Sequence, residues 1–211
     1  MFSRFRFLLF LGALLFGGWP ASLLANVPVQ PLKPPPQLPP QKPSTSSFLL
    51  IASHKLKDTW FRESVVLATQ TGHRGPVGII INRPQDITLD KIFPVYPAAR
   101  DFRLFAGGPV NPGQISYLFR SNEAVAGALK VSEHTYIAND MTLLRELLSG
   151  ARAHNGLRVA KRLAGWAPGQ LENEIAHGDW YVLPINDTII FDRPVADIWP
   201  ELSRQATTIS H

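Results

Sequence analysis

The chain contains no cysteine, and this absence excludes a whole group of chemistries. Thiol nucleophiles, disulfide bonds, cysteine-based zinc sites and lipoprotein acylation all require a thiol. The sequence also lacks an HExxH motif and any pair of histidines four residues apart. A P-loop, a dinucleotide-binding glycine fingerprint and a G-x-S-x-G nucleophile elbow are missing as well. These absences remove the well-marked enzyme classes, and we expect no metal and no cofactor.

The composition is that of one globular domain with appendages. The chain has 211 residues, of which 45% are hydrophobic and 18% are charged, and its formal net charge is +5. The basic residues are scattered, and one dense group stands out, formed by Arg152, Arg158, Lys161 and Arg162. We interpret this group as a solvated basic face rather than as a nucleic-acid patch.

The first 25 residues are typical of an export signal. Arg4 and Arg6 precede a continuous apolar run at residues 7–19, and the sequence Pro-Ala-Ser-Leu-Leu-Ala follows it up to Ala25. We interpret residues 1–25 as a signal peptide cleaved after Ala25 or, because the run is nearly long enough to span a bilayer, as a retained signal anchor. The expected location is therefore the periplasm or the inner membrane, with the cytosol as the alternative.

Residues 26–47 are rich in proline, with eight of the 19 prolines of the chain, including runs at 34–36 and 39–40. Proline lacks the backbone N–H and fixes φ, so this segment cannot form a helix or a strand ladder. The composition predicts a disordered, extended, polyproline-like linker. A plain tether is favoured over a recognition ligand for an aromatic groove.

Residues 48–205 form the predicted folded domain, followed by a tail at 206–211. Short apolar runs rich in β-branched residues alternate with a few helical patterns, and no βαβ unit recurs, so the fold class is α+β. Asp58 is expected to cap a turn or short helix at 58–63, and residues 73–75 are expected to form a hairpin turn. The expected strands are 48–53, 64–69, 77–82, 102–106, 114–120, 135–138, 157–166, 180–183 and 188–191. The expected helices are 88–93, 141–148, 170–177 and 195–205, the second capped by Asn139 or Asp140 and closed by Gly150.

Two motifs follow predicted strands and are candidates for a binding site. In Asn82-Arg83-Pro84, the arginine could hold a carboxylate or phosphate, or it could simply pair with a nearby acid. In Gly107-Gly108-Pro109, the glycines permit unusual φ angles, so their amides could face an anion. The alternative, which we favour, is a tight turn where two backbones pack together.

The segment from Trp166 to Trp180 concentrates the special residues of the chain. Glu172 and Glu174 lie in the first turns of a predicted helix, where the helix dipole already favours acids without any catalytic role. Gln170 and Glu172 could satisfy free amides at the helix start. The two tryptophans are interpreted mainly as core residues, with a platform for ligand stacking as the alternative.

Six segments in series identify a family resemblance. They are FLLIAS, DTWFRESVVLAT, GPVGIIINRP, FAGGPV, AGWAPGQLENEI with HGDW, and IIFDRPVADIWPEL. Together they resemble the YqgE/AlgH family of bacterial proteins over residues 46–205. The resemblance implies a compact α+β domain with a mixed, bifurcated, barrel-like sheet and no established enzymatic activity, and some members are described as transcriptional regulators of exopolysaccharide production. The implied shared surface comprises Asn82, Arg83, Pro84, Gly107, Gly108, Pro109, Trp166, Gly169, Gln170, Glu172 and Trp180.

Two features depart from the family pattern. The leader and linker are additions, and export would exclude direct control of transcription by this chain. The stretch LRVAKRLA at residues 157–164 carries basic residues where a more apolar strand is expected, which leaves its burial open.

The sequence predicts a non-enzymatic binding or regulatory protein. One alternative is a hydrolase or transferase with a cleft formed by Arg83, Gly107-Gly108 and Glu172. A second alternative is a nucleic-acid-binding regulator acting through residues 152–162. The partner is predicted to be a protein or a small anionic ligand, and membrane contact is expected only through the N-terminal segment.

Overall fold

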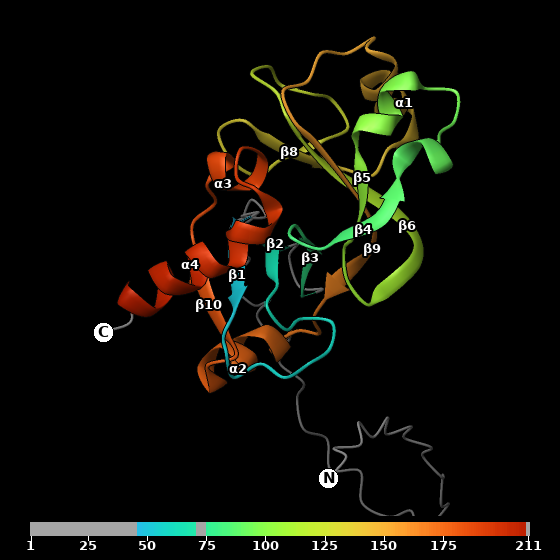
Figure 1. Cartoon of the computed structure of the whole chain (residues 1–211). Coiled ribbons are helices and arrows are strands. Elements are labelled where there is room, and N and C mark those ends of the chain that lie inside the picture. The colour runs from blue at the N-terminus through green and yellow to red at the C-terminus, as the bar shows by residue number, and fades with distance from the viewer. Residues whose placement is uncertain (1–45, 71–74, 210–211) are drawn as a thin grey trace, which may run out of the picture. The chain divides into compact units, whose positions relative to one another are not determined.

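A computed structural model describes residues 46–70 and 75–209, and the account that follows is confined to them. Figure 1 shows their arrangement. The predicted leader and nearly all of the predicted linker lie outside the described residues. So do His73 and Arg74 of the predicted hairpin turn and the last two residues of the tail.

The described residues form a ten-stranded sheet that curls and branches. Its strands are β1 (Ser46–Ala52), β2 (Val65–Gln70), β3 (Pro76–Ile80), β4 (Pro84–Thr88), β5 (Arg103–Ala106), β6 (Val110–Arg120), β7 (Leu129–Lys130), β8 (Thr135–Ala138), β9 (Leu157–Gly165) and β10 (Trp180–Leu183). The main path runs β10-β1-β2-β3-β9-β6-β8-β7, with β5 attached to β9 and β4 to β5. The β5–β9 pair is parallel and the others are antiparallel. The predicted mixed, bifurcated α+β fold is confirmed.

The branch lies on β9, which pairs with three other strands. Its first part lies between β6 and β5, and its last residues, Ala164 and Gly165, pair with Gly78 and Val77 of β3. At Arg162, between these two parts, the backbone adopts a φ of 71°, which a non-glycine residue rarely adopts. This irregularity marks the point where the strand passes from one part of the sheet to the other.

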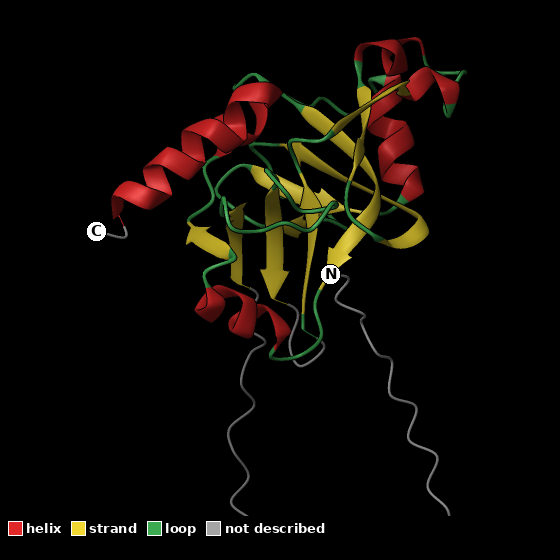
Figure 2. Cartoon of the chain, turned by 60° about the horizontal axis from the view of Figure 1, so that its bottom comes forward, coloured by secondary structure: helices red, strands yellow, loops and turns green. Residues whose placement is uncertain are grey.

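Helices lie on both faces of this sheet (Figure 2). They are the short 3-10 helices η2 (Leu89–Lys91) and η3 (Pro97–Asp101) and the α-helices α1 (Met141–Ser149), α2 (Gln170–His177), α3 (Asp187–Phe191) and α4 (Val195–Ile209). The bounds of α2 are confirmed. The cap of α1, predicted at Asn139 or Asp140, is Asp140, whose carboxylate accepts from the Leu143 amide at 2.7 Å. Gly150 ends α1 with a φ of 77°.

The period-2 alternation of the strands divides the core between the two faces. Leu49, Leu67 and Ile79 pack with residues of α3 and α4 on one face. Leu50, Val66, Ala68 and Ile80 pack on the other face with Trp166, Leu171 and Trp180, around α2. A third cluster surrounds α1 and the outer halves of β6 and β9. The helices therefore cover the sheet from opposite sides, as burial of both faces of an apolar strand requires.

The predicted strand at 188–191 is wrong, because this segment is helix α3. The β-branched residues favour a strand locally, but the Asn186 side chain accepts from the Thr188 amide at 3.0 Å and the Ile189 amide at 3.4 Å. Ile189 and Ile190 are buried in the core in the helical conformation. Tertiary burial and a local cap thus override strand propensity.

Other boundaries differ from the prediction by a few residues. β1 begins at Ser46, two residues before the expected start, and α4 continues to Ile209, through most of the predicted tail. Residues 88–93 contain only a 3-10 turn instead of a longer helix. Pro84 opens the unpredicted strand β4, where its missing N–H is tolerated at the first position.

The basic strand β9 is buried for most of its length despite its charges. Val159 and Ala160 have no exposed surface, and Arg158 is 8% exposed. The Arg158 guanidinium lies 5.0 Å from the Phe105 ring centroid and donates to the Ile81 carbonyl. Burial lowers the pKa of Arg158 to about 10. An aromatic face and a carbonyl therefore accommodate the buried cation.

Candidate functional site

Asn82 connects the end of β3 to the loop that precedes β2. Its side-chain oxygen accepts from the Val65 amide at 2.8 Å, and its side-chain nitrogen donates to the Glu63 carbonyl at 2.9 Å. Glu63 has a φ of 56°, a conformation in which its carbonyl would otherwise lack a regular partner. Both polar ends of Asn82 are thereby engaged within the protein.

Arg83 binds the same loop from the other side. Its guanidinium donates to the carbonyls of Thr59 at 3.4 Å, Trp60, and Arg62 at 2.7 Å. Burial lowers the pKa of Arg83 and the neighbouring Arg62 lowers it further, while Asp58 and Glu63 act in the opposite direction. Arg83 therefore pairs with backbone carbonyls rather than with the single acid that the sequence suggested. Asp58 itself caps the loop by accepting from the Trp60 amide at 2.8 Å.

The two glycines pack directly against the backbone of β9. The Gly107 amide donates to the Lys161 carbonyl at 2.9 Å, and a β-carbon at Gly107 would lie 2.3 Å from the Arg162 carbonyl oxygen. A β-carbon at Gly108, where φ is 153°, would lie 2.2 Å from the backbone of Leu163. The Gly107 amide is thus already used, and close backbone approach accounts for the glycine pair that precedes Pro109.

Trp166 and Trp180 converge on one carboxylate. The Nε1 groups of the two indoles donate to the same Glu174 oxygen, at 2.8 Å and 2.9 Å. Gln170 donates to the other Glu174 oxygen at 2.9 Å, and its own side-chain oxygen accepts from the Ala167 amide at 3.0 Å. The tryptophans are only 5% and 3% exposed, so Glu174 satisfies two buried indole N–H groups.

Glu174 makes these contacts, whereas the acid predicted from the sequence as part of the shared surface is Glu172. Glu172 lies exposed on α2, while the buried Leu171 and the half-buried Glu174 and Ile175 lie on the opposite face. The sequence did carry a signal for Glu174. It follows Leu171 by three residues, as Ile175 does by four, and this spacing places the three side chains on one face of a helix. Gly169, with a φ of 78°, forms the turn before α2, after which this face of the helix packs against the sheet.

The predicted residues do not converge in one cleft. A pocket of about 370 Å³ lies beside Arg83, and its lining comes from two loops and α4. The lining residues are Arg62, Glu63, Asn82, Arg83, Val195, Ala196, Trp199 and Pro200. Neither glycine of the pair lines this pocket, and neither does Glu172. The predicted residues therefore form two separate groups. Asn82 and Arg83 lie at one pocket, and Gln170 lies with the two tryptophans around Glu174.

The basic group near β9 is also divided. Arg152 forms an ion pair with Glu146 at 3.2 Å, and the Arg162 guanidinium lies 5.3 Å from the Trp60 ring centroid. Lys161 is exposed, whereas Arg158 is buried. These side chains consequently do not form one basic face.

An open apolar groove lies between β3 and β8, on the face of the sheet that carries α3 and α4. We call it the β3–β8 groove; it measures about 240 Å³. It is lined by Val77, Gly78, Ile79, Gln114, Ser116, Gly127, Leu129, Ile137, Ala138, Asn139 and Leu163. Val77 is 40% exposed and Leu129 is 37% exposed, so two large apolar side chains remain in contact with water. This groove was not predicted from the sequence, because Val77 lies in an apolar run that is typical of a buried strand.

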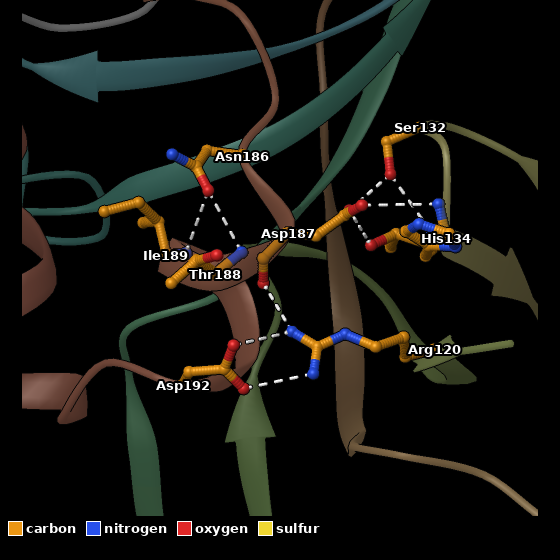
Figure 3. A network of polar contacts seen from close by, with 9 residues as sticks. Arg120, Ser132, His134, Asn186, Asp187, Thr188, Ile189 and Asp192 are labelled. Atoms are coloured by element: carbon orange, nitrogen blue, oxygen red, sulfur yellow. Dashed lines mark hydrogen bonds and ion pairs between the residues drawn. The ribbon is translucent and has the colours of Figure 1, made fainter. Parts of the chain in front are cut away.

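A polar network attaches α3 to the sheet beside this face (Figure 3). The Asp187 carboxylate accepts from the hydroxyls of Ser132 and Thr135 and from the His134 amide. Burial alone would raise the pKa of Asp187, but these hydrogen bonds outweigh it and lower the pKa. The network fixes the start of α3 against the turn between β7 and β8.

Arg120 extends this network to the end of α3. Its guanidinium donates to the Asp187 carbonyl at 3.0 Å and to both carboxylate oxygens of Asp192, at 3.1 Å and 2.9 Å. The same guanidinium lies 4.9 Å from the Phe191 ring centroid. The hydrogen bond from Arg120 is the main cause that lowers the pKa of Asp192.

The described residues contain neither a metal-binding cluster nor a membrane-spanning helix. Residues 46–70 and 75–209 contain no group of three or more acidic or histidine side chains that could hold a metal ion. Within the same residues, none of the helices has the length and apolarity needed to cross a membrane.

The geometry defines a single α+β domain built on a curled, branched sheet. The chain belongs to the AlgH-like family, whose model, DUF179, matches residues 49–209. A UPF0301 protein of Methylococcus capsulatus is 30% identical over 82% of this chain and 97% of the relative. A UPF0301 protein of Laribacter hongkongensis is 33% identical over 72% of this chain and 84% of the relative.

Two solved structures share the fold. The solution structure of AlgH from Pseudomonas aeruginosa matches with a TM-score of 0.64 and 22% identity, over 81% of this chain and 93% of that protein. A crystal structure of a protein from Corynebacterium diphtheriae matches with a TM-score of 0.65 and 22% identity, over 76% of this chain and 86% of the other. The resemblance read from the six sequence segments is thereby confirmed.

Proposed function

We propose that this chain is a non-enzymatic binding protein that receives apolar side chains of a protein partner in the β3–β8 groove. The observation that carries the proposal is the exposure of Val77 and Leu129 at a concave apolar site. An apolar concavity with polar neutral groups at its margin is the usual form of a site that takes a hydrophobic anchor. Gln114 and Asn139 supply such amide groups in the groove.

The charge of the groove favours a protein partner over a small anion. Its lining, among the described residues, contains no charged side chain. The cation that the sequence offered for an anion, Arg83, already donates to carbonyls of its own chain. An anionic ligand would have to displace these bonds, whereas an apolar side chain would displace only water from Val77 and Leu129.

The two alternative functions have less support. A hydrolase or transferase would need Arg83, the Gly107-Gly108 turn and Glu172 around one reacting centre, but Glu172 does not line the pocket at Arg83. A nucleic-acid binder would need a one-sided basic face, but Arg158 is buried and Arg152 is paired with Glu146.

A first experiment measures whether the groove accepts apolar groups. Nile red, a neutral dye that fluoresces in apolar surroundings, is titrated into the full chain and into Leu129→Asp and Val77→Asp variants. We expect both variants to lose most of the dye binding. Val182→Asp is the matched control, because Val182 is 47% exposed on β10 and lies outside the groove lining. Equal binding by all four proteins would contradict the proposal.

A second experiment tests for the protein partner itself. A photo-crosslinking amino acid replaces Leu129 in one version of the chain and Val182 in another, and both are irradiated in living cells. We expect a discrete protein adduct from position 129 that position 182 does not give. The same pattern from both positions, or no protein adduct from position 129, would count against a partner at the groove.

We further propose that the domain acts outside the cytoplasm, free or held by the N-terminal segment. The charge and apolar order of residues 1–25 support this proposal. A reporter that is active only in the cytoplasm is fused after Thr45, one residue before β1. We expect no reporter activity, and strong activity would place the domain in the cytosol.

A further inference from the structure

The loop between α1 and β9 contains the one Asn-Gly pair in the sequence, Asn155-Gly156. Asn155 is exposed, and its side chain forms no hydrogen bond with the described residues. Within the same part of the chain, the Gly156 N–H donates to no acceptor. The side-chain amide and the backbone nitrogen that follows it are therefore both free to react.

The structure requires glycine at position 156. Its φ is 114°, and a β-carbon there would lie 2.8 Å from the Phe191 ring. Any other residue would clash with α3 and adopt a strained backbone. As a consequence, no β-carbon shields the backbone nitrogen that follows Asn155.

We propose that Asn155 is a site of spontaneous deamidation. The Gly156 nitrogen, losing its proton to solvent base, attacks the Asn155 side-chain carbon, and the side-chain nitrogen takes up a proton and leaves as ammonia. A five-membered succinimide ring links residues 155 and 156. Water then adds to one of the two ring carbonyls and breaks a C–N bond, which leaves either aspartate or isoaspartate. The balance is one water consumed and one ammonia released.

The surroundings supply the water that this chemistry needs. An open pocket of about 540 Å³ adjoins the loop, lined by polar residues that include Arg120, Arg152 and Asn155 itself. Asparagine is among the thermally labile residues of proteins, and an exposed loop does not restrain its side chain. The product carboxylate would lie in the same pocket as Arg120 and Arg152.

Isoaspartate at position 155 would disturb the attachment of α3. The Asn155 amide donates to the Arg120 carbonyl at 3.4 Å, and the Arg120 amide donates to the Gly156 carbonyl at 3.1 Å. Isoaspartate lengthens the main chain by one carbon between these two bonds, so both cannot persist. The Arg120 side chain also holds Asp192 at 2.9 Å and lies against Phe191. The modification would thus accumulate irreversibly as the protein ages, and it would weaken the contacts that attach α3 to the sheet.

The test incubates the full-length folded chain at mildly alkaline pH and follows it by tryptic peptide mapping. Trypsin releases residues 153–158 as one peptide, in which replacement of an amide by a carboxylate is read by mass. We expect this peptide to convert before the peptide of residues 163–204, which contains both Asn173 and Asn186 and in which fragmentation tells the two positions apart. Isoaspartate is detected by its specific methylation. Asn186 is a built-in comparison, because its side chain caps α3.

Variants and a second measurement complete the test. Asn155→Gln should abolish the mass change and keep the denaturation midpoint of the fresh protein. Wild-type protein aged until half converted should show a second, lower midpoint that the aged Asn155→Gln protein lacks. Conversion of Asn173 ahead of Asn155, or conversion of Asn155 only in urea-unfolded protein, would overturn the assignment.

Discussion

The two faces of the curled sheet are covered to different extents, and the difference separates architecture from the candidate binding surface. On one face, Trp166 and Trp180 are buried, and Glu174 of α2 accepts from both indoles. On the other, α3 and α4 cover β1, β2 and β10 but leave Val77 and Leu129 exposed in the β3–β8 groove. The first face is covered by α2, which specific hydrogen bonds attach to the tryptophans. The second face is covered by helices only in part.

Several residues that are unusual in the sequence have structural contacts in the fold. Asn82 and Arg83 form hydrogen bonds to the loop before β2, and the paired glycines pack against the backbone of β9. The two tryptophans donate their indole N–H groups to Glu174. The large apolar side chains of the groove are valine, leucine and isoleucine, which carry no distinctive signal in a sequence. An uncovered apolar side chain becomes informative only when its neighbours in space are known.

The largest expected effect on stability would come from a substitution in the buried core beneath α2. Trp166→Ala should lower the free energy of unfolding by about 3–5 kcal/mol, because it removes a large buried aromatic and leaves a cavity. Denaturant unfolding, followed by circular dichroism, measures this change. A Trp166→Ala protein as stable as wild type would mean that the segment is a ligand site rather than part of the core.

The next effect distinguishes the two acids of α2. Glu174→Ala should cost about 1–3 kcal/mol, because two buried indole N–H groups lose their acceptor. Glu172→Ala is the matched control, since it makes the same change on the exposed face and should stay within about 0.5 kcal/mol. Equal costs in the two denaturant titrations would contradict the role assigned to Glu174.

A smaller effect concerns acid and the attachment of α3. The pKa values of Asp187 and Asp192 are lower in the folded state than in the unfolded state. These carboxylates therefore stabilise the fold when the pH lies above their unfolded-state pKa. This contribution should be lost as pH falls below the ordinary aspartate value of 3.8 toward the lowered folded-state values. Thermal melts across this range should show a shallower acid decline for Asp187→Asn than for wild type.

The control for the acid experiment is Asp86→Asn, which alters an exposed carboxylate of β4. Its melting temperature should decline with acid as steeply as that of the wild type. If Asp187→Asn declines equally steeply, the network in Figure 3 does not couple α3 to pH.

The smallest effect on stability is expected in the groove. Leu129→Ala should change the free energy of unfolding by no more than about 0.5 kcal/mol, because Leu129 is 37% exposed. The same variant should bind Nile red more weakly than wild type. A large loss of stability would instead make this wall of the groove part of the core, and the contrast between the faces would disappear.

Elements specified by neighbouring residues were predicted well from the sequence. α1 was predicted with a cap at Asn139 or Asp140, of which the structure shows Asp140, and with its Gly150 end, and α2 was predicted with both of its bounds. Caps and glycine ends act within one helical turn, so their signals lie side by side in the chain. Thr188–Phe191 was mispredicted because the burial of Ile189 and Ile190, which favours the helix, depends on distant strands.

The sequence by itself determined the family, the α+β class, the absence of thiol chemistry and the position of most elements. Tertiary structure alone decided that Glu174 rather than Glu172 meets the tryptophans and that Arg158 is buried against Phe105. It also decided that the apolar surface left open lies at Val77 and Leu129. The physical reason is that periodicity and caps act over a few residues, whereas these contacts depend on strand register and on which helix covers which face.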